Sequence, residues 1–439
     1  MIRTVAANSR EQQALFDDMR ARAEKNAAEV RERVAEIISD VRQGGWEAVR
    51  ALSLRFDNAE PYEISQARCR EAMDACDPAV LDAMRRAAKN IEDYQRRLMP
   101  CENEWQNSDG GRVGVRIRGL TRVGVYVPGG SAAYPSSLLM NIIPAKVAGV
   151  REIIVVTPPT VHLRPEVLAA AHIAGADRVF AVGGPVACAA LAFGAGDIPK
   201  VDKIVGPGNA YVTEAKRQLF GLIDIDMTAG PSEILILADE TAEPAYAAAD
   251  MLSQAEHSAD ASAVLLTTSR SLAEAVVTEL ESQLKTLPRR AAAEASLDSF
   301  GAVVLCGTMD EAVALANEIA PEHLEIMTES PRSLLPGIVN AGAVFLGAYT
   351  PEPVGDYMAG PCHVLPTSGT ARFFSPLSVD DFLKKTSVLE YDAPSLARIA
   401  AHTAAFAMAE GLDAHARSVT CRGGAASGCE TGENRGGAL

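Results

Sequence analysis

Short apolar runs alternate with stretches of helical periodicity from residue 123 onward. The apolar runs are rich in β-branched residues. This alternation is typical of buried parallel strands that are joined by crossover helices. The first half of the region predicts strands at residues 123–127, 153–157, 179–182 and 203–205, with helices at 137–149, 165–174, 185–193 and 209–222.

The alternation resumes after residue 232 and predicts a second set of strands. These strands are expected at residues 233–238, 263–267, 303–306, 324–327 and 344–346. Together the two sets contain too many strands for one small sheet. We therefore predict an α/β fold with two doubly wound, Rossmann-like α/β domains, each of roughly a hundred residues or more.

Both ends of the chain predict helical segments instead. Ser9 begins a helix through a capping box, an amphipathic run stops at the glycine pair 44–45, and Asp77 caps a third helix. From about Ser378 the sequence is again typical of helix. The Gly-rich tail of residues 421–439 is expected to be disordered.

Composition excludes several classes of partner. The 439 residues are 48% hydrophobic and 22% charged, as in globular domains. The net charge of −16 disfavours nucleic acid as the main partner. No apolar run reaches the ~18 residues that a membrane span needs, and no signal-peptide region follows the N-terminus. The eight cysteines are scattered and form no C-x-x-C pair, which is typical of free thiols in a cytoplasmic protein.

The richest glycine signal is the segment VGPGN at residues 205–209, which follows a predicted strand and opens a helix. Backbone N–H groups there could bind an anion or a nucleotide. The segment lacks the G-x-G-x-x-G fingerprint, however, and a tight turn explains it equally well. Glycines also follow two other predicted strands, at residues 126–130 and 182–185. Three such loops favour a ligand crevice at the carboxyl ends of the strands.

Two pairs of residues could carry chemistry. Gln254 and His257 lie three residues apart near a helix end and share one face. Both side chains can ligate a metal, but two ligands do not define a zinc site, and a locally hydrogen-bonded histidine is the more frequent explanation. Glu322 and His323 stand at a strand entrance, where a carboxylate and an imidazole could form an acid/base pair.

Further candidates lie near the C-terminus. Glu352, Asp356 and His363 fall in a Gly- and Pro-rich stretch that we expect to be a loop, where catalytic groups often gather. Glu410 and His415 follow the end of a predicted helix. The other three histidines are interpreted as packing residues: His162, His172 and His402.

Eight segments together resemble the histidinol dehydrogenase family, and they occur in the family's order. They are GVYVPGGSAAYPSS (124–137), VGPGN (205–209), DMTAGPSE (226–233), SQAEH (253–257), PEHLE (321–325), GDY (355–357), HVLPT (363–367) and EGLDAH (410–415). Because they extend over some three hundred residues, the resemblance is specific. The N-terminal helices fit the family more loosely.

The resemblance implies a zinc- and NAD-dependent enzyme that oxidises L-histidinol to L-histidinal and then to L-histidine, the last step of histidine biosynthesis. One zinc ion per subunit would be held by Gln254, His257, Asp356 and His415. The catalytic pair would be Glu322 and His323, and NAD would lie near Tyr126 and Asn209. The substrate would contact Ser232, Gln254, His257, His323, Glu352, Asp356, His363, Glu410 and His415.

The resemblance also implies a homodimer with shared active sites. A C-terminal helical segment, residues 377–420, would reach the partner subunit, so that Glu410 and His415 serve the other subunit's site. The remaining implied parts are an N-terminal helical segment (1–24), a first α/β domain (25–124 with 233–376) and a second α/β domain on the cofactor side (125–232).

Three positions depart from the family pattern. Val186 replaces a Gln that contacts NAD, Ser258 replaces a Gly that follows a zinc ligand, and Cys362 replaces an Asn. Val186 cannot form the hydrogen bond of the Gln, which puts the affinity for NAD in question. Cys362 is interpreted as a small neutral filler, with an oxidation-sensitive thiol as the less frequent alternative.

Two rival functions stay open at this point. A paralogue could use the same machinery on another primary alcohol, such as a sulfonated diol. A sulfonate favours Arg or Lys beside the glycine loop, where Ser131 stands, whereas Glu352 and Glu410 suit a cationic substrate. A catalytically inactive scaffold is disfavoured because Glu322, His323 and all four zinc positions are retained.

Overall fold

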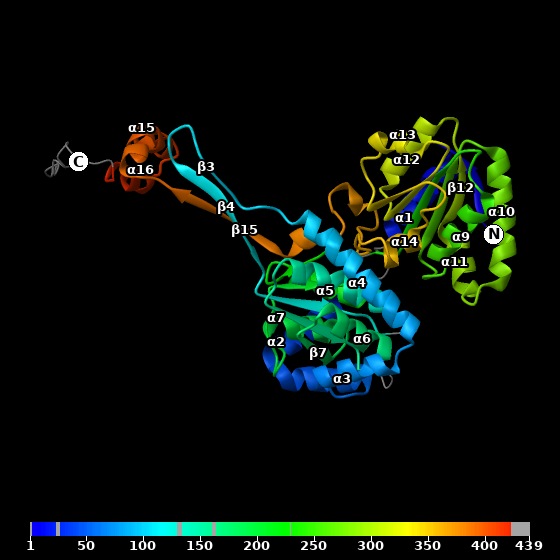
Figure 1. Cartoon of the computed structure of the whole chain (residues 1–439), viewed down its shortest axis with the longest axis horizontal. Helices are drawn as coiled ribbons and strands as arrows, with labels where there is room; N and C mark the ends of the chain where they lie inside the picture. Colours follow the sequence, from blue (N-terminus) through cyan, green and yellow to red (C-terminus); the bar gives the residue numbers. More distant parts are fainter. Residues whose placement is uncertain (1, 23–26, 130–133, 160–163, 229, 423–439) are drawn as a thin grey trace, which may run out of the picture. The chain divides into compact units, whose positions relative to one another are not determined.

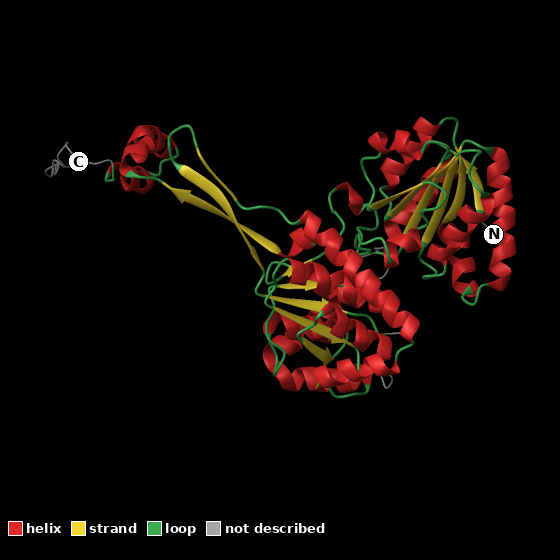
Figure 2. Ribbon diagram, in the orientation of Figure 1, coloured by secondary structure: helices red, strands yellow, loops and turns green. Residues whose placement is uncertain are grey.

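Figures 1 and 2 show the helices and strands of the computed structural model, which describes residues 2–22, 27–129, 134–159, 164–228 and 230–422. The chain divides into two units. Met1–Met99 with Gly119–Leu383 form the first unit, and Pro100–Arg118 with Lys384–Leu439 form the second. Among the described residues, the first unit contains two six-stranded sheets and the second contains most of a three-stranded sheet.

The first sheet has the strand order β1-β12-β11-β10-β13-β14, and its neighbouring strands run parallel. Its strands are β1 (Arg3–Ala6), β10 (Glu233–Ala238), β11 (Ser262–Thr267), β12 (Gly301–Leu305), β13 (His323–Met327) and β14 (Ala343–Leu346). Its helices are α1 (Arg10–Ala21), α9 (Pro244–Ala255), α10 (Arg270–Gln283), α11 (Arg290–Phe300), α12 (Met309–Ile319), α13 (Pro331–Leu334) and α14 (Glu352–Tyr357). Apolar side chains of the central strands pack against α9, α10 and α11 on one face and against α1 and α12 on the other.

The second sheet has the order β2-β7-β6-β5-β8-β9, in which only β2 runs antiparallel among the described strands. Its strands are β2 (Tyr62–Ile64), β5 (Arg122–Tyr126), β6 (Glu152–Thr157), β7 (Arg178–Ala181), β8 (Lys203–Val205) and β9 (Asp224–Ile225). Its helices are α2 (Ala27–Asp57), α3 (Gln66–Glu71), α4 (Pro78–Leu98), α5 (Pro135–Val147), α6 (Pro165–Ala174), α7 (Gly184–Phe193) and α8 (Ala210–Leu219). Helices α4, α5 and α6 cover one face, and α2, α7 and α8 cover the other.

The predicted fold class is confirmed, because helices cover both faces of each sheet. The apolar runs after residue 123 form β5 to β8 and β10 to β14, each within two residues of its predicted bounds. Continuous apolar sequence marks these strands because both of their faces are buried. Strands β1, β2 and β9, at two to four residues long, did not stand out from the sequence.

The helices between residues 27 and 98 pack against the second sheet. Apolar residues of α2 and α4 belong to the two cores of the second sheet, and β2 pairs with β7 of that sheet. The helical stretch that begins at Ala27 ends at the glycine pair 44–45, as the sequence predicted. Gly45, with φ 55° and ψ −134°, kinks the chain there, and a second helical stretch runs to Asp57.

The second unit is built around a sheet of order β15-β4-β3. It consists of β3 (Asn103–Gln106), β4 (Arg112–Gly119), β15 (Leu383–Glu390), α15 (Ala393–Ala409) and α16 (Asp413–Thr420). The prediction of helix from Ser378 is wrong at β15, which adds to the edge of β4 and exposes most of its residues. Arg398 of α15 donates a hydrogen bond to the Asp109 carbonyl at 2.8 Å, which ties the helix to the β3–β4 hairpin.

Short 3-10 turns are η2 (Ala72–Ala75), η3 (Leu284–Thr286), η4 (Leu335–Gly337), η5 (Thr370–Arg372) and η6 (Val379–Phe382). The seven cysteines within the described ranges are free thiols. In the same part of the chain, no helix combines the length and hydrophobicity needed to cross a bilayer. Residues 423–439, expected to be disordered, and His162 lie outside the described residues.

Candidate active site

The residues predicted as a catalytic pair stand where β13 begins, at the amino-terminal edge of the first sheet. Ala320, with a left-handed φ of 53°, caps α12 and turns the chain toward Glu322 and His323. Strand β10 begins beside them at Glu233, in a register that pairs Ile234 with His323. The pair thus lies at the amino ends of parallel strands, whereas ligand sites in such sheets usually lie at the carboxyl ends.

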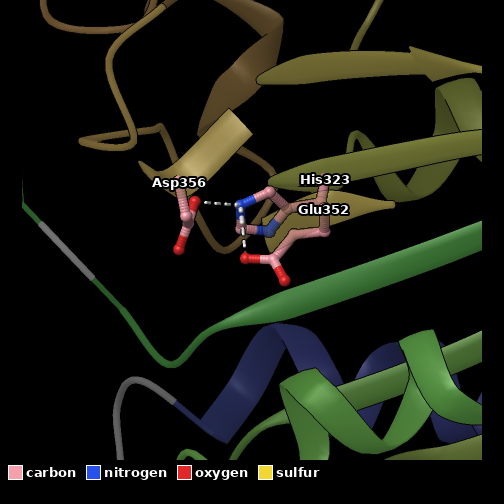
Figure 3. A group of neighbouring side chains, drawn as sticks. All are labelled: His323, Glu352 and Asp356. Carbon is pink, nitrogen blue, oxygen red and sulfur yellow. Dashed lines mark ion pairs between the residues drawn. The ribbon is translucent and has the colours of Figure 1, made fainter. Parts of the chain in front are cut away.

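Hydrogen bonding sets the tautomer of His323, whose side chain is buried. The Nδ1–H group donates to the carbonyl oxygen of Glu233 at 2.9 Å. In a neutral ring Nε2 therefore carries the lone pair. Nε2 has no hydrogen-bond partner in the described part of the chain, and it lies 3.8 Å from one carboxylate oxygen each of Glu352 and Asp356 (Figure 3). Nε2 is accordingly the ring atom that can accept a proton.

Glu322 is held by the same residue of β10. Its Oε2 accepts a hydrogen bond from the N–H of Glu233 at 2.9 Å and lies 3.6 Å from Nδ1 of His323. Burial raises the pKa of Glu322 to about 7, although the neighbouring imidazole acts in the opposite direction. A carboxyl group with a pKa near 7 is suited to take a proton from water at neutral pH.

Negative charge accumulates around His323. Burial lowers the pKa of this imidazole, but Glu322, Asp356 and Glu352 outweigh burial and raise the pKa to about 10. Such a concentration of buried carboxylates attracts a cation. A divalent cation held by Asp356 would oppose the carboxylates and bring the pKa of His323 back toward neutrality, where the ring can act as a base.

Three of the four predicted zinc ligands belong to the first unit. Gln254 is buried at the end of α9, with its Nε2 3.4 Å from Nδ1 of His323, and its Oε1 has no hydrogen-bond partner among the described residues. His257 is exposed and donates its Nδ1–H to the carbonyl of Ser253 at 2.9 Å, so that Nε2 keeps its lone pair. Together with the Asp356 carboxylate these are oxygen and nitrogen donors, which fit a zinc ion.

A second, overlapping group of possible metal ligands is evident in Figure 3. His323, Glu352 and Asp356 offer ligand atoms that lie within 4.8 Å of one another. Only Asp356 belongs both to this group and to the predicted zinc ligands. Glu352 begins α14 and is buried, and its Oε2 accepts a hydrogen bond from Ser253 at 3.3 Å. The structure therefore brings two predicted zinc ligands, Asp356 and Gln254, next to His323.

His363 follows α14 and is oriented by that helix. Its Nδ1–H donates to the Asp356 carbonyl at 3.2 Å, and its Nε2 lies 3.4 Å from the hydroxyl of Ser137, a buried residue of α5. The neighbouring Cys362 is buried, and its thiol donates to the Met140 carbonyl at 3.4 Å. Burial raises the pKa of this thiol, so it stays neutral, which agrees with the interpretation of Cys362 as a filler.

The other predicted substrate residues are not brought into this cluster by any contact within the described chain. Ser232 directly precedes β10 and is half-buried. Glu410 follows the last residue of α15 and His415 lies in α16, so both belong to the second unit, where they are exposed. His172 is half-buried in α6, whereas His402 is exposed on α15, contrary to its interpretation as a packing residue.

The two residues expected near NAD lie at the carboxyl edge of the second sheet. Tyr126 ends β5, and its hydroxyl accepts a hydrogen bond from the N–H of Gly184 at 3.2 Å. Asn209 caps α8 by accepting from two backbone N–H groups of that helix. A cavity of about 270 Å³ is lined by Asn209, Gly184 and Val186, among others. Val186 thus presents an apolar side chain to this cavity.

A buried carboxyl pair beside the site was not predicted from the sequence. Glu325 on β13 and Asp250 on α9 share a hydrogen bond, and Glu325 Oε1 accepts from the N–H of Glu352 at 2.7 Å. Burial is the main cause that raises the pKa of Glu325 to about 9 and that of Asp250 to about 6. Acidic residues inside an apolar strand and helix are the signal that could have revealed the pair, as it could for Glu233.

Two doubly wound sheets and a cluster of imidazole and carboxyl groups define an α/β enzyme with acid/base chemistry at a candidate cation site. A family model of histidinol dehydrogenase matches residues 20–423. The chain belongs to the histidinol dehydrogenase family. The predicted family and the predicted class of enzyme, an oxidoreductase, are thereby confirmed.

Individual relatives agree with this assignment. The chain is 48% identical over 414 residues to the histidinol dehydrogenase of Listeria innocua, covering 93% of this chain and 97% of that protein. It is 51% identical over 398 residues to that of Bacillus subtilis, covering 90% and 93%. The crystal structure of histidinol dehydrogenase from Elizabethkingia anophelis is similar, with a TM-score of 0.89 at 32% identity over 96% of this chain and 98% of that chain.

The buried pair of Glu325 and Asp250 predicts a pH-dependent gain in stability for Glu325→Gln. In the wild type between about pH 4.5 and 9, Glu325 is protonated in the folded state but ionised in the unfolded state. The free energy of unfolding therefore falls as the pH rises through this range. The Gln side chain does not titrate, so its contribution to stability does not change with pH. Its amide oxygen can still accept the hydrogen bond from the Glu352 N–H. We expect the metal-free variant to be more stable than the wild type by about 1–3 kcal/mol at pH 8.

Urea unfolding at pH 5 and pH 8 measures this difference, which should be small at pH 5 and larger at pH 8. Glu329→Gln, at an exposed carboxyl group, is the matched control and should change stability by less than about 0.5 kcal/mol. A Glu325→Gln variant that is no more stable than the wild type at pH 8 would show that Glu325 is ionised in the folded protein.

Proposed function

We propose that this enzyme oxidises L-histidinol through L-histidinal to L-histidine in two NAD-dependent steps, with one zinc ion in each active site. Family membership supports the substrate and the reaction. The observation that carries the proposal is the start of β13, where His323 has an unpartnered Nε2 among the described residues and Glu322 has a pKa raised to about 7. Two successive oxidations need two proton acceptors. One takes the hydroxyl proton of the alcohol, and the other takes a proton from the water that adds to the aldehyde.

His323 would accept the hydroxyl proton of the alcohol at Nε2. Its hydrogen bond from Nδ1–H to Glu233 favours the tautomer in which Nε2 is the basic atom. Bound NAD supplies the hydride acceptor for both oxidations. Tyr126 and Asn209 would bind this cofactor beside the cavity at the carboxyl edge of the second sheet, where Val186 offers no hydrogen bond.

Glu322 would act in the second oxidation, in which water must add to the aldehyde before another hydride can leave. Its carboxylate would take a proton from that water, and the N–H of Glu233 would hold the carboxylate in place. Since burial raises the pKa of Glu322 to about 7, the reactive carboxylate form gains population as the pH rises through neutrality.

The zinc ion would be held by Gln254, His257, Asp356 and His415, and when bound it orients the amino alcohol through the substrate's nitrogen atoms. The remaining contacts to the substrate would come from Ser232, Glu352, His363 and Glu410. Glu352 and Glu410 carry carboxyl groups, which suit the positive charge of an ammonium or imidazolium group. Burial raises the pKa of Glu352 to about 8, and a positive group beside it would favour its ionised form. A sulfonated alcohol, the substrate class of the rival paralogue, would meet repulsion at the same residues.

We further propose a homodimer in which Glu410 and His415 complete the partner's active site. Large apolar side chains near these residues are exposed in the single chain, since Phe406 is 72% and Met408 is 56% exposed. Exposed apolar surface of this kind favours burial against another protein surface. A cytoplasmic location stays a prediction that rests on the scattered free thiols.

The proposed role of Glu322 predicts unequal effects on the two oxidations. Glu322→Gln should slow the oxidation of L-histidinal about 10²–10⁴-fold, because the variant lacks the group that takes the proton from water. Oxidation of L-histidinol to the aldehyde should be affected much less. NADH formation in single turnovers, started from each substrate, separates the two steps, with Glu329→Gln as the control. Equal losses in both steps would remove the water-activating role.

The proposed ligand His415 predicts a joint loss of metal and activity. His415→Asn should lower the zinc content and the rate of histidinol oxidation together, since one of four protein ligands is removed. Metal analysis of the purified dimer measures the zinc content, and NADH formation measures the rate of histidinol oxidation. His402→Asn, at an exposed histidine of the neighbouring helix, is the matched control. A full zinc content in His415→Asn would mean that the ligand assignment is wrong.

A further inference from the structure

Glu233 contacts both members of the catalytic pair through its main chain. Its N–H donates to Oε2 of Glu322 at 2.9 Å, and its carbonyl oxygen accepts from Nδ1–H of His323 at 2.9 Å. The position of this one residue therefore determines where the Glu322 carboxylate lies and how the imidazole is turned. Both hydrogen bonds are buried.

The side chain of Glu233 is fixed by a buried ion pair. Its Oε1 accepts a hydrogen bond from Nη2 of Arg22, and the two side chains are only 4% and 1% exposed. Arg22 caps the end of α1 and is itself held from two further sides. Its Nη1 donates to the Asp260 carbonyl at 2.9 Å, and its guanidinium lies 5.3 Å from the centre of the Phe300 ring.

Burying an ion pair at this position is unfavourable for the free energy of folding. Two charges removed from water lose more solvation than their attraction usually restores, and apolar residues of similar size often stabilise a fold as well or better. The pair does, however, hold Glu233 in one geometry, because the planar guanidinium fixes the direction as well as the distance of the carboxylate. No reaction step is assigned to the side chains of Arg22 and Glu233. The Glu233 carboxyl group does reach the backbone of Glu322, and its charge helps to raise the pKa of the Glu322 carboxyl group.

We propose that Arg22 and Glu233 are positioning residues for the reaction, which act through the main chain of Glu233 on Glu322 and His323. The inference rests on the proposed function, since it requires that these two residues carry out the proton transfers. Small displacements of catalytic groups reduce the rate of the chemical step more than the binding of substrate. The pair should therefore affect kcat more than KM.

Steady-state kinetics of three variants, assayed as zinc-loaded protein with L-histidinol, test the proposal. Arg22→Met and Glu233→Gln should lower kcat about 10–100-fold, as is typical for residues that orient the ligands of a metal site, and should leave KM for histidinol within roughly threefold. Zinc content should be unchanged because no ligand is altered. Arg22→Lys, which keeps the charge, should recover a clear part of the kcat that Arg22→Met loses.

A double variant, Arg22→Met with Glu233→Met, separates positioning from stability. Removing both charges should restore much of the melting temperature that either single change costs, while kcat stays low. Arg122→Met is the matched control, because it breaks a half-buried pair with Glu152 in the second sheet and should leave kcat unchanged. If Arg22→Met and Glu233→Gln fail to fold, the kcat values of Arg22→Lys and of the double variant test the proposal instead.

The outcomes distinguish this inference from the function on which it rests. A wild type that turns over histidinol, together with variants of normal kcat, would overturn the positioning role alone. Recovery of kcat in parallel with melting temperature in the double variant would also overturn it, since the pair would then be purely structural. A wild type that does not oxidise histidinol would overturn the proposed function and this inference together.

Discussion

Two main-chain hydrogen bonds from Glu233 hold the candidate catalytic pair, and the chemistry proposed for this enzyme depends on them. One fixes the tautomer of His323 and the other anchors the carboxylate of Glu322. Both require that β10 and β13 start side by side, in the register that pairs Ile234 with His323. The packing of the first sheet favours this register, because a slip by one residue would exchange the two faces of β13 and move Leu324 and Ile326 out of the core that they share with α1 and α12.

Electrostatics gives this site its second constraint. Glu322, Glu352 and Asp356 surround one imidazole, and burial makes each additional negative charge costly. The cluster is therefore suited to positively charged partners, which a metal ion and a cationic substrate both provide. The same argument disfavours an anionic alcohol as the substrate. Near this cluster, Glu325 and Asp250 share a hydrogen bond. The pKa of Glu325, raised to about 9, keeps this group protonated at neutral pH, so the pair adds less negative charge than two ionised carboxylates would.

Much of the fold could be predicted from the sequence, because strands buried on both faces leave continuous apolar runs. The runs at residues 123–127 and 233–238 are examples, and the structure has β5 and β10 there. Strand β15 could not be predicted in this way. It lies at a sheet edge with most of its residues exposed, so its sequence carries no burial pattern and was interpreted as helix.

The candidate site was predictable only for residues whose chemistry is distinctive. His323, Asp356 and His363 are rare titratable residues at the ends of elements, and the structure brings them together. Glu233 stood in a matching motif but was not singled out, because its contact with His323 joins residues 90 positions apart and depends on strand pairing. Arg22 was missed for the same reason, since its partner is 211 positions away.

The central claim is that one site carries out both oxidations of histidinol. The most direct test is to count the NADH formed per histidinol consumed by the purified, zinc-loaded enzyme and to identify the product. The account predicts about two NADH per histidinol, with histidine as the product and no release of the aldehyde. One NADH per histidinol with accumulation of histidinal, or turnover of a different alcohol only, would contradict it.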